Sequence, residues 1–413
     1  MITKQEKDAI HSICLTVEQR LKEKHIGCFQ GSDIPLFLIS TEYPGLWLEH
    51  VYDSVFYAKL YPSQLEIAKN AILIFIDHQT PEGQYPCYYY DSAKIDCKED
   101  EIFGYSQIQE CVSFASLCCE VCEMVNDSAL TVKVYESLKK WDNWLRKYRM
   151  TRNLGLVEMF VGYDTGHDHS GRLNGLSCPG NYVQDGKLMN AGILPPNDDV
   201  APVIAVDMNA NFYGTQKALA KLANMCGRCE EATEWERKAV EVKTRLLEFC
   251  YDETDAFFYD VDKHGNKRKY LSSTILHLFM EKVLNLQEDK AIIDAIYTRH
   301  LKNPNEFWTE YPFPSMAVCD PSCANHKASN CWGYYSQALI ALRCTRWMDD
   351  YGYSKDFDSI CQKWLKAWTT CYKEMKFGQE LDPFTGKPTS SSEWYSSCML
   401  FYLYAAKRLE IFD

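Results

Sequence analysis

The sequence predicts an all-helical fold, arranged as a barrel of paired helices, and three observations support this prediction. Apolar residues recur at helical spacing along much of the chain, strand-like alternation is scarce, and short and long connections alternate between the helical segments. Hydrophobic residues make up 46% of the 413 positions, which is enough for a large core. We expect one domain over residues 1–413, because a barrel of helical hairpins accommodates this length around a single core.

The predicted helices follow from the positions of the apolar residues. The segment 65–78 has a clear helical pattern and is followed by the stop signal Thr80-Pro81-Glu82-Gly83. The first thirty residues also carry apolar positions at helical spacing. Further helices are predicted over 107–125, 129–148, 207–226, 231–249, 272–285, 336–347, 357–374 and 394–409.

Two connections, 155–202 and 302–330, are long, aromatic and rich in Gly, Pro and Asp. In a ring of paired helices the long loops gather at one end. Long loops on a rigid scaffold are where binding and catalytic residues concentrate. We therefore expect the functional site at that end of the barrel.

Charge and hydropathy restrict the partners and the compartment. The net charge of -13 argues against nucleic acid, whose binding depends on clustered Lys and Arg. The first thirty residues lack the apolar core of a secretion signal, and no later stretch is apolar for the length of a bilayer crossing. We expect a cytoplasmic protein without a membrane partner. The oligomeric state cannot be read from the sequence.

The 19 cysteines are expected to be mostly reduced and buried, because the cytosol keeps thiols reduced and a long chain has a core without disulfides. Two pairs, Cys119 with Cys122 and Cys226 with Cys229, have a spacing that suits zinc. Neither pair is accompanied by a matching His cluster. We predict no metal and no cofactor.

The densest polar cluster lies in the first long loop, over residues 162–172, and contains Asp164, His167, Asp168, His169 and Arg172. Glycosidic cleavage needs one protonated carboxylic acid and, across the sugar, a carboxylate that activates water. A loop with several acids can shift the pKa of one of them. Two alternatives are a calcium loop, which lacks its terminal Glu here, and a metal site at the two histidines.

Several motifs resemble glycoside hydrolase family sixty-three and its trehalase and mannosylglycerate-hydrolase relatives over nearly the whole chain. Tyr52-Asp53-Ser54-Val55-Phe56 is similar to Trp-Asp-Ser-x-Phe before a helix, and Gln79 to Gly83 is similar to Gln-x-Pro-x-Gly. The segment 164–172 is similar to Glu-Ser-Gly-x-Asp-Asn-Ser-Pro-Arg, which is the most specific match. The segment 311–321 resembles the loop Pro-x-Pro-Ser-x-Ala followed by Asp-Asp-Pro, and Trp332-Gly333 resembles a Trp-Arg-Gly segment without its arginine.

The resemblance implies an (α/α)6 barrel and a set of site residues. It places Asp168 at the general acid, Arg172 at a neighbouring charge that orients the site, and Asp53 and Gln107 at contacts to the sugar. Asp164, in the same loop, joins the candidate sugar contacts. Asp207, in a segment similar to Val-Asp-Leu-Asn-Ala, either caps a helix or contacts substrate.

The second carboxylate is less well placed by the resemblance. Relatives carry Glu three residues before an Asp-Pro-x-Thr-Gly turn, and here that position is Gln379, with Glu380 one residue later. Either Glu380 is the base, which we favour, or Glu393 reaches the site from the following segment. A third possibility is that Gln379 replaces the base and alters catalysis.

Aromatic side chains in the predicted loops are candidates for stacking on sugar, whose rings present apolar C–H faces. Packing between helices is the alternative explanation for each of them. The candidates are Trp47, Tyr52, Trp308, Tyr311 and Trp332.

These observations favour an inverting, exo-acting α-glycosidase whose partner is a small carbohydrate substrate. One alternative is a sugar epimerase or isomerase that uses His167 and His169 as paired bases. Another is a non-catalytic glycan-binding protein, suggested by Gln379.

Overall fold

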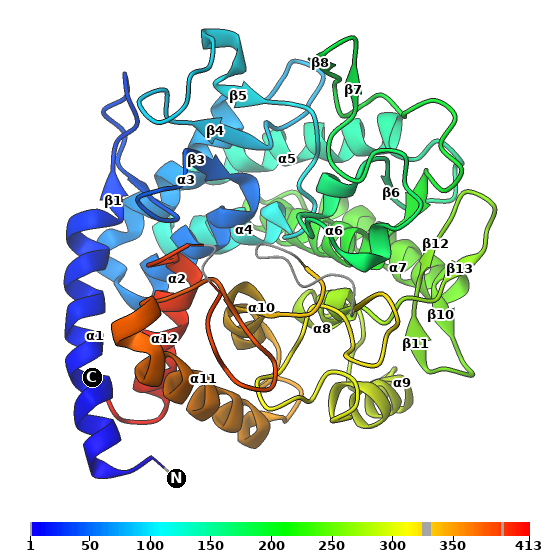
Figure 1. The fold of residues 1–413 in the computed structure, drawn as a ribbon. Coiled ribbons are helices and arrows are strands. Elements are labelled where there is room, and N and C mark those ends of the chain that lie inside the picture. Colours follow the sequence, from blue (N-terminus) through cyan, green and yellow to red (C-terminus); the bar gives the residue numbers. More distant parts are fainter. Residues whose placement is uncertain (1, 324–331, 390–391) are drawn as a thin grey trace.

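The computed structural model describes residues 2–323, 332–389 and 392–413 and confirms the predicted helical fold (Figure 1). In these ranges every strand has only two or three residues. The helices are α1 (Lys4–Lys24), α2 (Val51–Leu60), α3 (Leu65–Asp77), α4 (Phe114–Val125), α5 (Ser128–Tyr148), α6 (Val206–Met225), α7 (Cys229–Phe249), α8 (Leu276–Met280), α9 (Lys290–Ile296), α10 (Ala338–Arg343), α11 (Ser354–Met375) and α12 (Ser396–Arg408).

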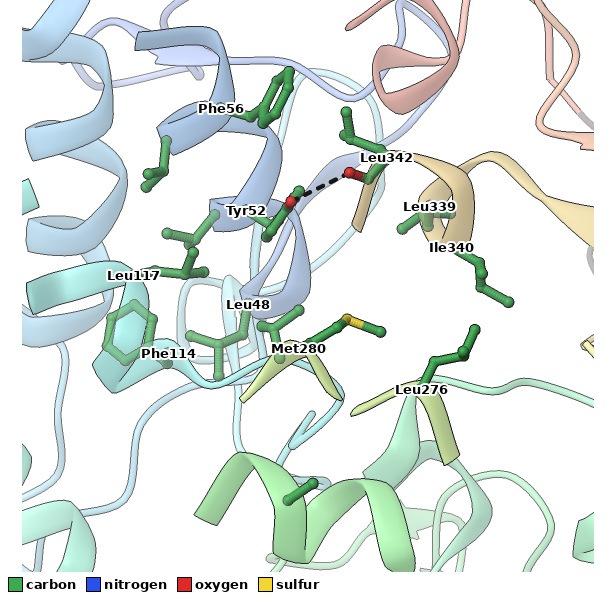
Figure 2. Packing of buried hydrophobic residues seen from close by; sticks show 14 of the residues in the cluster. Leu48, Tyr52, Phe56, Phe114, Leu117, Leu276, Met280, Leu339, Ile340 and Leu342 are labelled. Atoms are coloured by element: carbon green, nitrogen blue, oxygen red, sulfur yellow. Dashed lines mark hydrogen bonds between the residues drawn. The ribbon is translucent and has the colours of Figure 1, made fainter. Parts of the chain in front are cut away.

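The helices form an inner and an outer ring. Among the even-numbered helices, α2 contacts α4, α4 contacts α6, α6 contacts α8, α10 contacts α12, and α12 returns to α2. Odd-numbered helices lie outside them: α3 packs on α2, α5 and α7 pack on α6, and α1 and α11 pack on α12 (Figure 1). Apolar side chains from α2, α4, α8 and α10 meet in the core of the ring (Figure 2). Burial of these side chains is the main stabilising contribution to the ring.

Short connections between neighbouring helices have clear local causes. Asn126 ends α4 in the left-handed conformation, with φ 53°. The next residue, Asp127, caps α5 by accepting hydrogen bonds from the backbone N–H groups of Ala129 and Leu130, at 2.7 and 3.1 Å. The chain therefore reverses within two residues, and α4 and α5 pack side by side.

Six of the predicted helices, at 65–78, 129–148, 207–226, 231–249, 357–374 and 394–409, are confirmed within a few residues of their ends. The helix predicted over 107–125 begins only at Phe114, because Gln109 has φ 51° and the Ser113 side chain caps the helix. The helices predicted over 272–285 and 336–347 shorten to α8 and α10.

Two helices, α2 and α9, were not predicted from the sequence. Residues 51–58 of α2 are all buried, so this helix has no amphipathic stripe to reveal it. The motif at Tyr52 to Phe56 lies within α2 and does not precede a helix.

The connections between the helices contain small antiparallel sheets. One is β3-β4-β5 (Gly45–Trp47, Tyr88–Tyr90 and Phe103–Gly104), and another is β13-β12-β9-β6 (Lys267–Arg268, Asp260–Val261, Val203–Ile204 and Glu158–Met159). Strand pairs are β1 with β2 (Ile26–Gly27, Leu36–Phe37), β7 with β8 (Val183–Gln184, Lys187–Leu188), β10 with β11 (Tyr251–Asp252, Phe257–Phe258) and β14 with β15 (Ser336–Gln337, Glu380–Leu381).

No group of three or more His, Cys, Asp or Glu side chains in the described ranges is arranged to hold a metal ion. Cys119 and Cys122 lie on α4, and Cys229 begins α7. None of the helices described is long and apolar enough to cross a membrane.

Candidate active site

A cavity of about 290 Å³ opens where the inner helices begin, since residues just before α2, α4 and α12 line it. It brings together four of the predicted site residues, namely Trp47, Gln107, Asp168 and Trp332. Its other lining residues were not singled out as cavity residues from the sequence: Tyr43, Glu49, His50, Tyr88, Tyr90, Gln109, Tyr163, Gly166, Asn181, Leu188, Gln379 and Tyr395.

Asp168 is half-buried in the wall of this cavity. Burial, followed by the negative charge of Glu49, raises the pKa of its carboxyl to about 7. Tyr43 and Tyr163 line the same cavity, and burial, followed by nearby negative charge that includes Asp168, raises the pKa of each phenol. A carboxyl with this pKa holds a proton over much of the neutral range and is able to deliver it to a leaving group.

Asp164, four residues earlier in the same loop, has a different environment. It is fully buried and forms an ion pair with Arg149. It also accepts hydrogen bonds from the backbone N–H groups of Phe160 (2.9 Å), Val161 (3.1 Å) and Ile108 (3.1 Å). Asp164 lies outside the cavity lining, so its contacts fix the loop and not a sugar.

Gly166 lets the loop pass closely beside Glu49. Its φ is +64°, and a Cβ at this position would lie 2.7 Å from Cys111 Sγ and 3.2 Å from Glu49 Oε2. Both the backbone conformation and the lack of space require glycine. The carboxylate of Glu49 therefore lies against the loop that carries Asp168.

Glu49 and His50 form part of a short 3-10 turn before α2. Glu49 Oε2 is 3.3 Å from Arg343 Nη2 and accepts a hydrogen bond from Cys111 Sγ at 3.3 Å. His50 is 3% exposed, and its Nε2 is 2.7 Å from the hydroxyl of Tyr395. Burial lowers the pKa of His50, so the imidazole is neutral.

Aromatic rings on the β3-β4-β5 sheet form one wall. Trp47 and Tyr88 are directly paired across the strands. Tyr88 stacks on Tyr90 with ring centroids 4.0 Å apart, and Trp47 meets Tyr90 edge-on at 5.8 Å. On another wall, Trp332 stacks on His167 at 4.1 Å. These rings give the cavity apolar faces of the kind that pack against sugars.

His167 and His169, considered for metal binding or for paired bases, lie in different environments. Burial lowers the pKa of His167 far below its ordinary value, whereas His169 is exposed. Neither histidine lines the cavity.

Three charged residues predicted to serve the site make buried contacts elsewhere. Arg172 donates to Asp207 at 3.0 Å at the start of α6. Asp53 accepts hydrogen bonds from the hydroxyls of Ser396 and Ser397, which join α2 to α12. None of the three predicted residues lines the cavity, so their contacts hold the scaffold around it.

Neither Glu380 nor Glu393, the two candidates for the base, lines the cavity. Glu380 is fully buried and accepts hydrogen bonds from Gln337 Nε2 at 2.9 Å and Thr389 Oγ1 at 2.8 Å. Gln379 lines the cavity, and burial, together with negative charges that include Glu380, raises the pKa of Tyr43 in the cavity wall. Glu393 is exposed.

Three of the predicted aromatic contacts also lie outside the cavity lining. The hydroxyl of Tyr52 is 3.2 Å from that of Thr345. Trp308 lies under the Lys302 ammonium, at 3.6 Å from the ring centre. Tyr311 packs against Gly386. Packing accounts for these three rings.

The structure contains two larger hollows, one next to the cavity and one at the other end of the inner ring. A groove of about 980 Å³ shares Tyr88, Tyr90 and Leu188 with it and runs along residues 95–106 and 185–190. The other hollow, of about 870 Å³, lies among residues from the later turns of α2, α4, α6 and α12. It therefore opens at the opposite end of the inner ring.

Comparison with known proteins finds similarity to glycoside hydrolases. The family model described as the mannosylglycerate hydrolase MGH1-like glycoside hydrolase domain matches residues 52–396. A probable trehalase from Eremothecium gossypii is 21% identical over 247 residues, which cover 56% of this chain and 32% of that protein. The chain thus spans about a third of that relative's length.

Two solved structures have the same fold at low sequence identity. The glycoside hydrolase family 63 mannosylglycerate hydrolase from Thermus thermophilus, solved with Tris, has a TM-score of 0.70 and 16% identity, with 96% of this chain and 99% of that chain covered. Neutral trehalase Nth1 from Saccharomyces cerevisiae has a TM-score of 0.66 and 12% identity, with coverages of 96% and 80%. The two helical rings are those of an (α/α)6 barrel, as predicted.

Proposed function

Because the chain belongs to the mannosylglycerate hydrolase MGH1-like glycoside hydrolase family, we propose that it is an inverting, exo-acting glycosidase that cleaves a small α-glycoside. Asp168 is the general acid in this proposal. The observation that carries it is a carboxyl with a pKa of about 7 in the wall of an aromatic-lined cavity.

The size of the cavity supports a small substrate. Its volume of about 290 Å³ lies just below the range for small-molecule sites, roughly 300–1,000 Å³. A terminal sugar occupies the cavity, and the leaving group extends into the groove that shares Tyr88 and Tyr90. The names of the structural neighbours suggest mannosylglycerate and trehalose as the first substrates to test.

Asp168 delivers its proton to the glycosidic oxygen while a second carboxylate removes a proton from the attacking water. Since the acid must be protonated, kcat/KM is expected to fall as the pH rises through about 7.

The test is to incubate the purified protein with a panel of α-linked disaccharides and glycosides and to follow the released sugar by proton NMR. The expected first product is a β-anomer, because single displacement inverts the configuration. An α-anomer as first product contradicts inversion. Deuterium uptake into an uncleaved sugar indicates an epimerase, and binding without any product indicates a glycan-binding protein.

A further inference from the structure

The passage from the cavity to the neighbouring groove is apolar. Tyr88, Tyr90 and Leu188 line both the cavity of about 290 Å³ and the groove of about 980 Å³, so they lie where the two meet. Tyr88 and Tyr90 stack with ring centroids 4.0 Å apart. Leu188 belongs to β8 and is 52% exposed. A group bound in this passage therefore meets two aromatic rings and one aliphatic side chain.

Leu188 is presented by the hairpin of β7 and β8, which lies at the same end of the barrel as β4 and β5 (Figure 1). Asp185 and Gly186 in its turn both have positive φ, 51° and 75°, as in the two-residue turns that join adjacent antiparallel strands. Val183 pairs directly with Leu188 across the strands and is exposed to nearly the same degree, at 54%. Val183, however, lines neither the cavity nor the groove.

Hydrogen bonds on both sides of the hairpin connect it to the segment 95–106, which also lines the groove. Before β7, Ser106 Oγ donates to Asn181 Oδ1 at 3.3 Å. After β8, the backbone N–H of Ala191 donates to the carbonyl oxygen of Tyr105 at 2.8 Å. These bonds hold the hairpin in place before a ligand binds, and a preorganised contact costs less to form.

The groove carries more negative than positive charge. Lys98 Nζ lies 3.8 Å from Glu101 Oε1, so part of the positive charge is already balanced. A negatively charged leaving group is repelled along this groove, whereas an uncharged one is not. The charged side chains of its described lining are the four carboxylates of Asp96, Asp100, Glu101 and Asp185 and the two ammonium groups of Lys98 and Lys187.

We propose that the leaving group of the substrate is an uncharged sugar ring whose apolar face packs on Leu188 and the Tyr88–Tyr90 pair, and that Leu188 determines the specificity for it. This inference rests on the proposed function. A sugar ring presents C–H groups on its faces and hydroxyl groups at its edge, which suits an apolar passage that opens into a polar groove. A three-carbon acid such as glycerate has no such face and carries the charge that the groove repels.

The test uses substrates that share one α-linked glycosyl group, the one identified by the NMR panel, and differ only in the leaving group. They are a disaccharide, the glycoside of glycerate and the glycosyl fluoride, whose leaving group is a single atom. In the wild-type protein, kcat/KM for the disaccharide is expected to exceed that for the glycerate glycoside by ~10-fold or more. Raising the salt concentration from about 0.05 to about 1 M should narrow this difference, because salt screens charge.

Leu188→Ala and Val183→Ala form a matched pair of variants. Both remove an exposed aliphatic side chain from the same hairpin, but only Leu188 lines the passage. Leu188→Ala is expected to raise KM for the disaccharide by ~10-fold with little change in kcat, because a contact to the non-reacting part of the substrate is lost. Its activity on the fluoride should equal that of the wild type, since fluoride is too small to reach Leu188. Val183→Ala should match the wild type on all three substrates.

The failures of the two proposals are distinguishable. The inference is overturned if the wild-type protein prefers the glycerate glycoside, if its preference does not change with salt, or if Leu188→Ala slows the fluoride as much as the disaccharide. It is also overturned if Val183→Ala raises KM as much as Leu188→Ala. In each case a substrate is still cleaved, so the glycosidase function stands. A wild-type protein that cleaves none of the three substrates overturns the proposed function and this inference with it.

Thermal unfolding checks that the variants are folded. Both side chains are more than half exposed, so neither substitution removes core packing. Leu188→Val is a second variant that keeps a branched aliphatic residue on the strand. A KM for the disaccharide between those of the wild type and Leu188→Ala supports the contact, and a KM equal to that of the wild type contradicts it.

Discussion

The two ends of the inner ring differ in the ion pairing of the carboxylates that line their hollows. The hollow of about 870 Å³ at the later turns of the helices is three times as large as the cavity of about 290 Å³ at their beginnings. Each carboxylate that lines it lies close to a cation. The pairs are Glu120 with Arg346 and Lys59, Glu281 with Arg346, Glu123 with Lys221, and Glu236 with Lys217.

At the smaller end, Glu49 is paired with Arg343 at 3.3 Å, whereas Asp168 has no ion pair in the described part of the chain and is influenced by the negative charge of Glu49. Paired charges stabilise a structure and have little tendency to exchange protons, whereas an uncompensated carboxyl has a shifted pKa. The difference teaches that electrostatic environment, and not volume, distinguishes the end of the barrel at which we propose catalysis.

The largest effect is expected from Asp168→Asn. The amide has nearly the same shape but no proton to give, so kcat/KM should fall by about 10³-fold or more. Steady-state kinetics on the substrate found by NMR measures this. The circular dichroism spectrum of the variant should match that of the wild type. Substantial turnover by the variant would contradict a catalytic role for the end of the ring that carries Asp168.

Arg346→Met tests the opposite end. Arg346 contacts both Glu120, at 2.7 Å, and Glu281, at 3.6 Å, and removing it leaves two largely buried carboxylates without this cation. We expect a loss of about 3 kcal/mol in the free energy of unfolding, measured by urea titration. The kcat of the folded fraction should stay unchanged; a selective loss of kcat would assign catalysis to this end as well.

A smaller effect concerns the stability of the acid itself. The pKa of Asp168 is about 7 in the folded chain and near 3.8 when unfolded, so the folded state binds this proton more tightly. Its ionisation therefore costs stability as the pH rises from about 4 to 7, and the cost is complete above pH 7. Asp168→Asn should raise the unfolding free energy by about 1–3 kcal/mol at pH 8 and leave it unchanged near pH 4.

Equal stabilities of wild type and Asp168→Asn at pH 8, compared by urea titration at both pH values, would mean that Asp168 is not electrostatically strained.

The smallest effect is expected from Lys217→Ala, which removes an exposed pair with Glu236 at the larger hollow. Exposed ion pairs contribute at most about 0.5 kcal/mol here, because solvent screens them. Thermal unfolding and kcat should both remain close to wild type. A clear rise in KM would show that this hollow binds substrate.

The sequence predicted the helical barrel because most of its helices have one apolar face, and it predicted Asp168 because the acid lies in a distinctive loop. From the sequence, Asp164 in the same loop was expected to contact the sugar, because no local pattern shows which groups surround each of the two carboxyls. Only the fold places Arg149 and three backbone N–H groups around Asp164.

The other site residues depend on partners that are remote in the chain. Asp53 is bound by serines 343 and 344 positions later, and Arg343 reaches Glu49 from 294 positions away. No local pattern near Glu49 indicates these contacts. Gln379 and Glu380 are adjacent in the sequence, yet only Gln379 lines the cavity, while Glu380 lies in β15, which pairs with β14.

The aromatic wall of the cavity limits which sequence changes related chains can carry around this cavity. Trp47, Tyr88 and Tyr90 stand on paired strands, while Tyr89 faces the other way and stacks on Phe103 at 4.6 Å. Loss of one residue from β4 would exchange the two faces of the strand. This wall therefore tolerates substitution of its aromatic side chains but not a change in the length of the strand. The facing loop, from 155 to 202, lacks that constraint. Related chains that act on other sugars should therefore differ in the length of this loop and, on the strands, only in the kind of side chain.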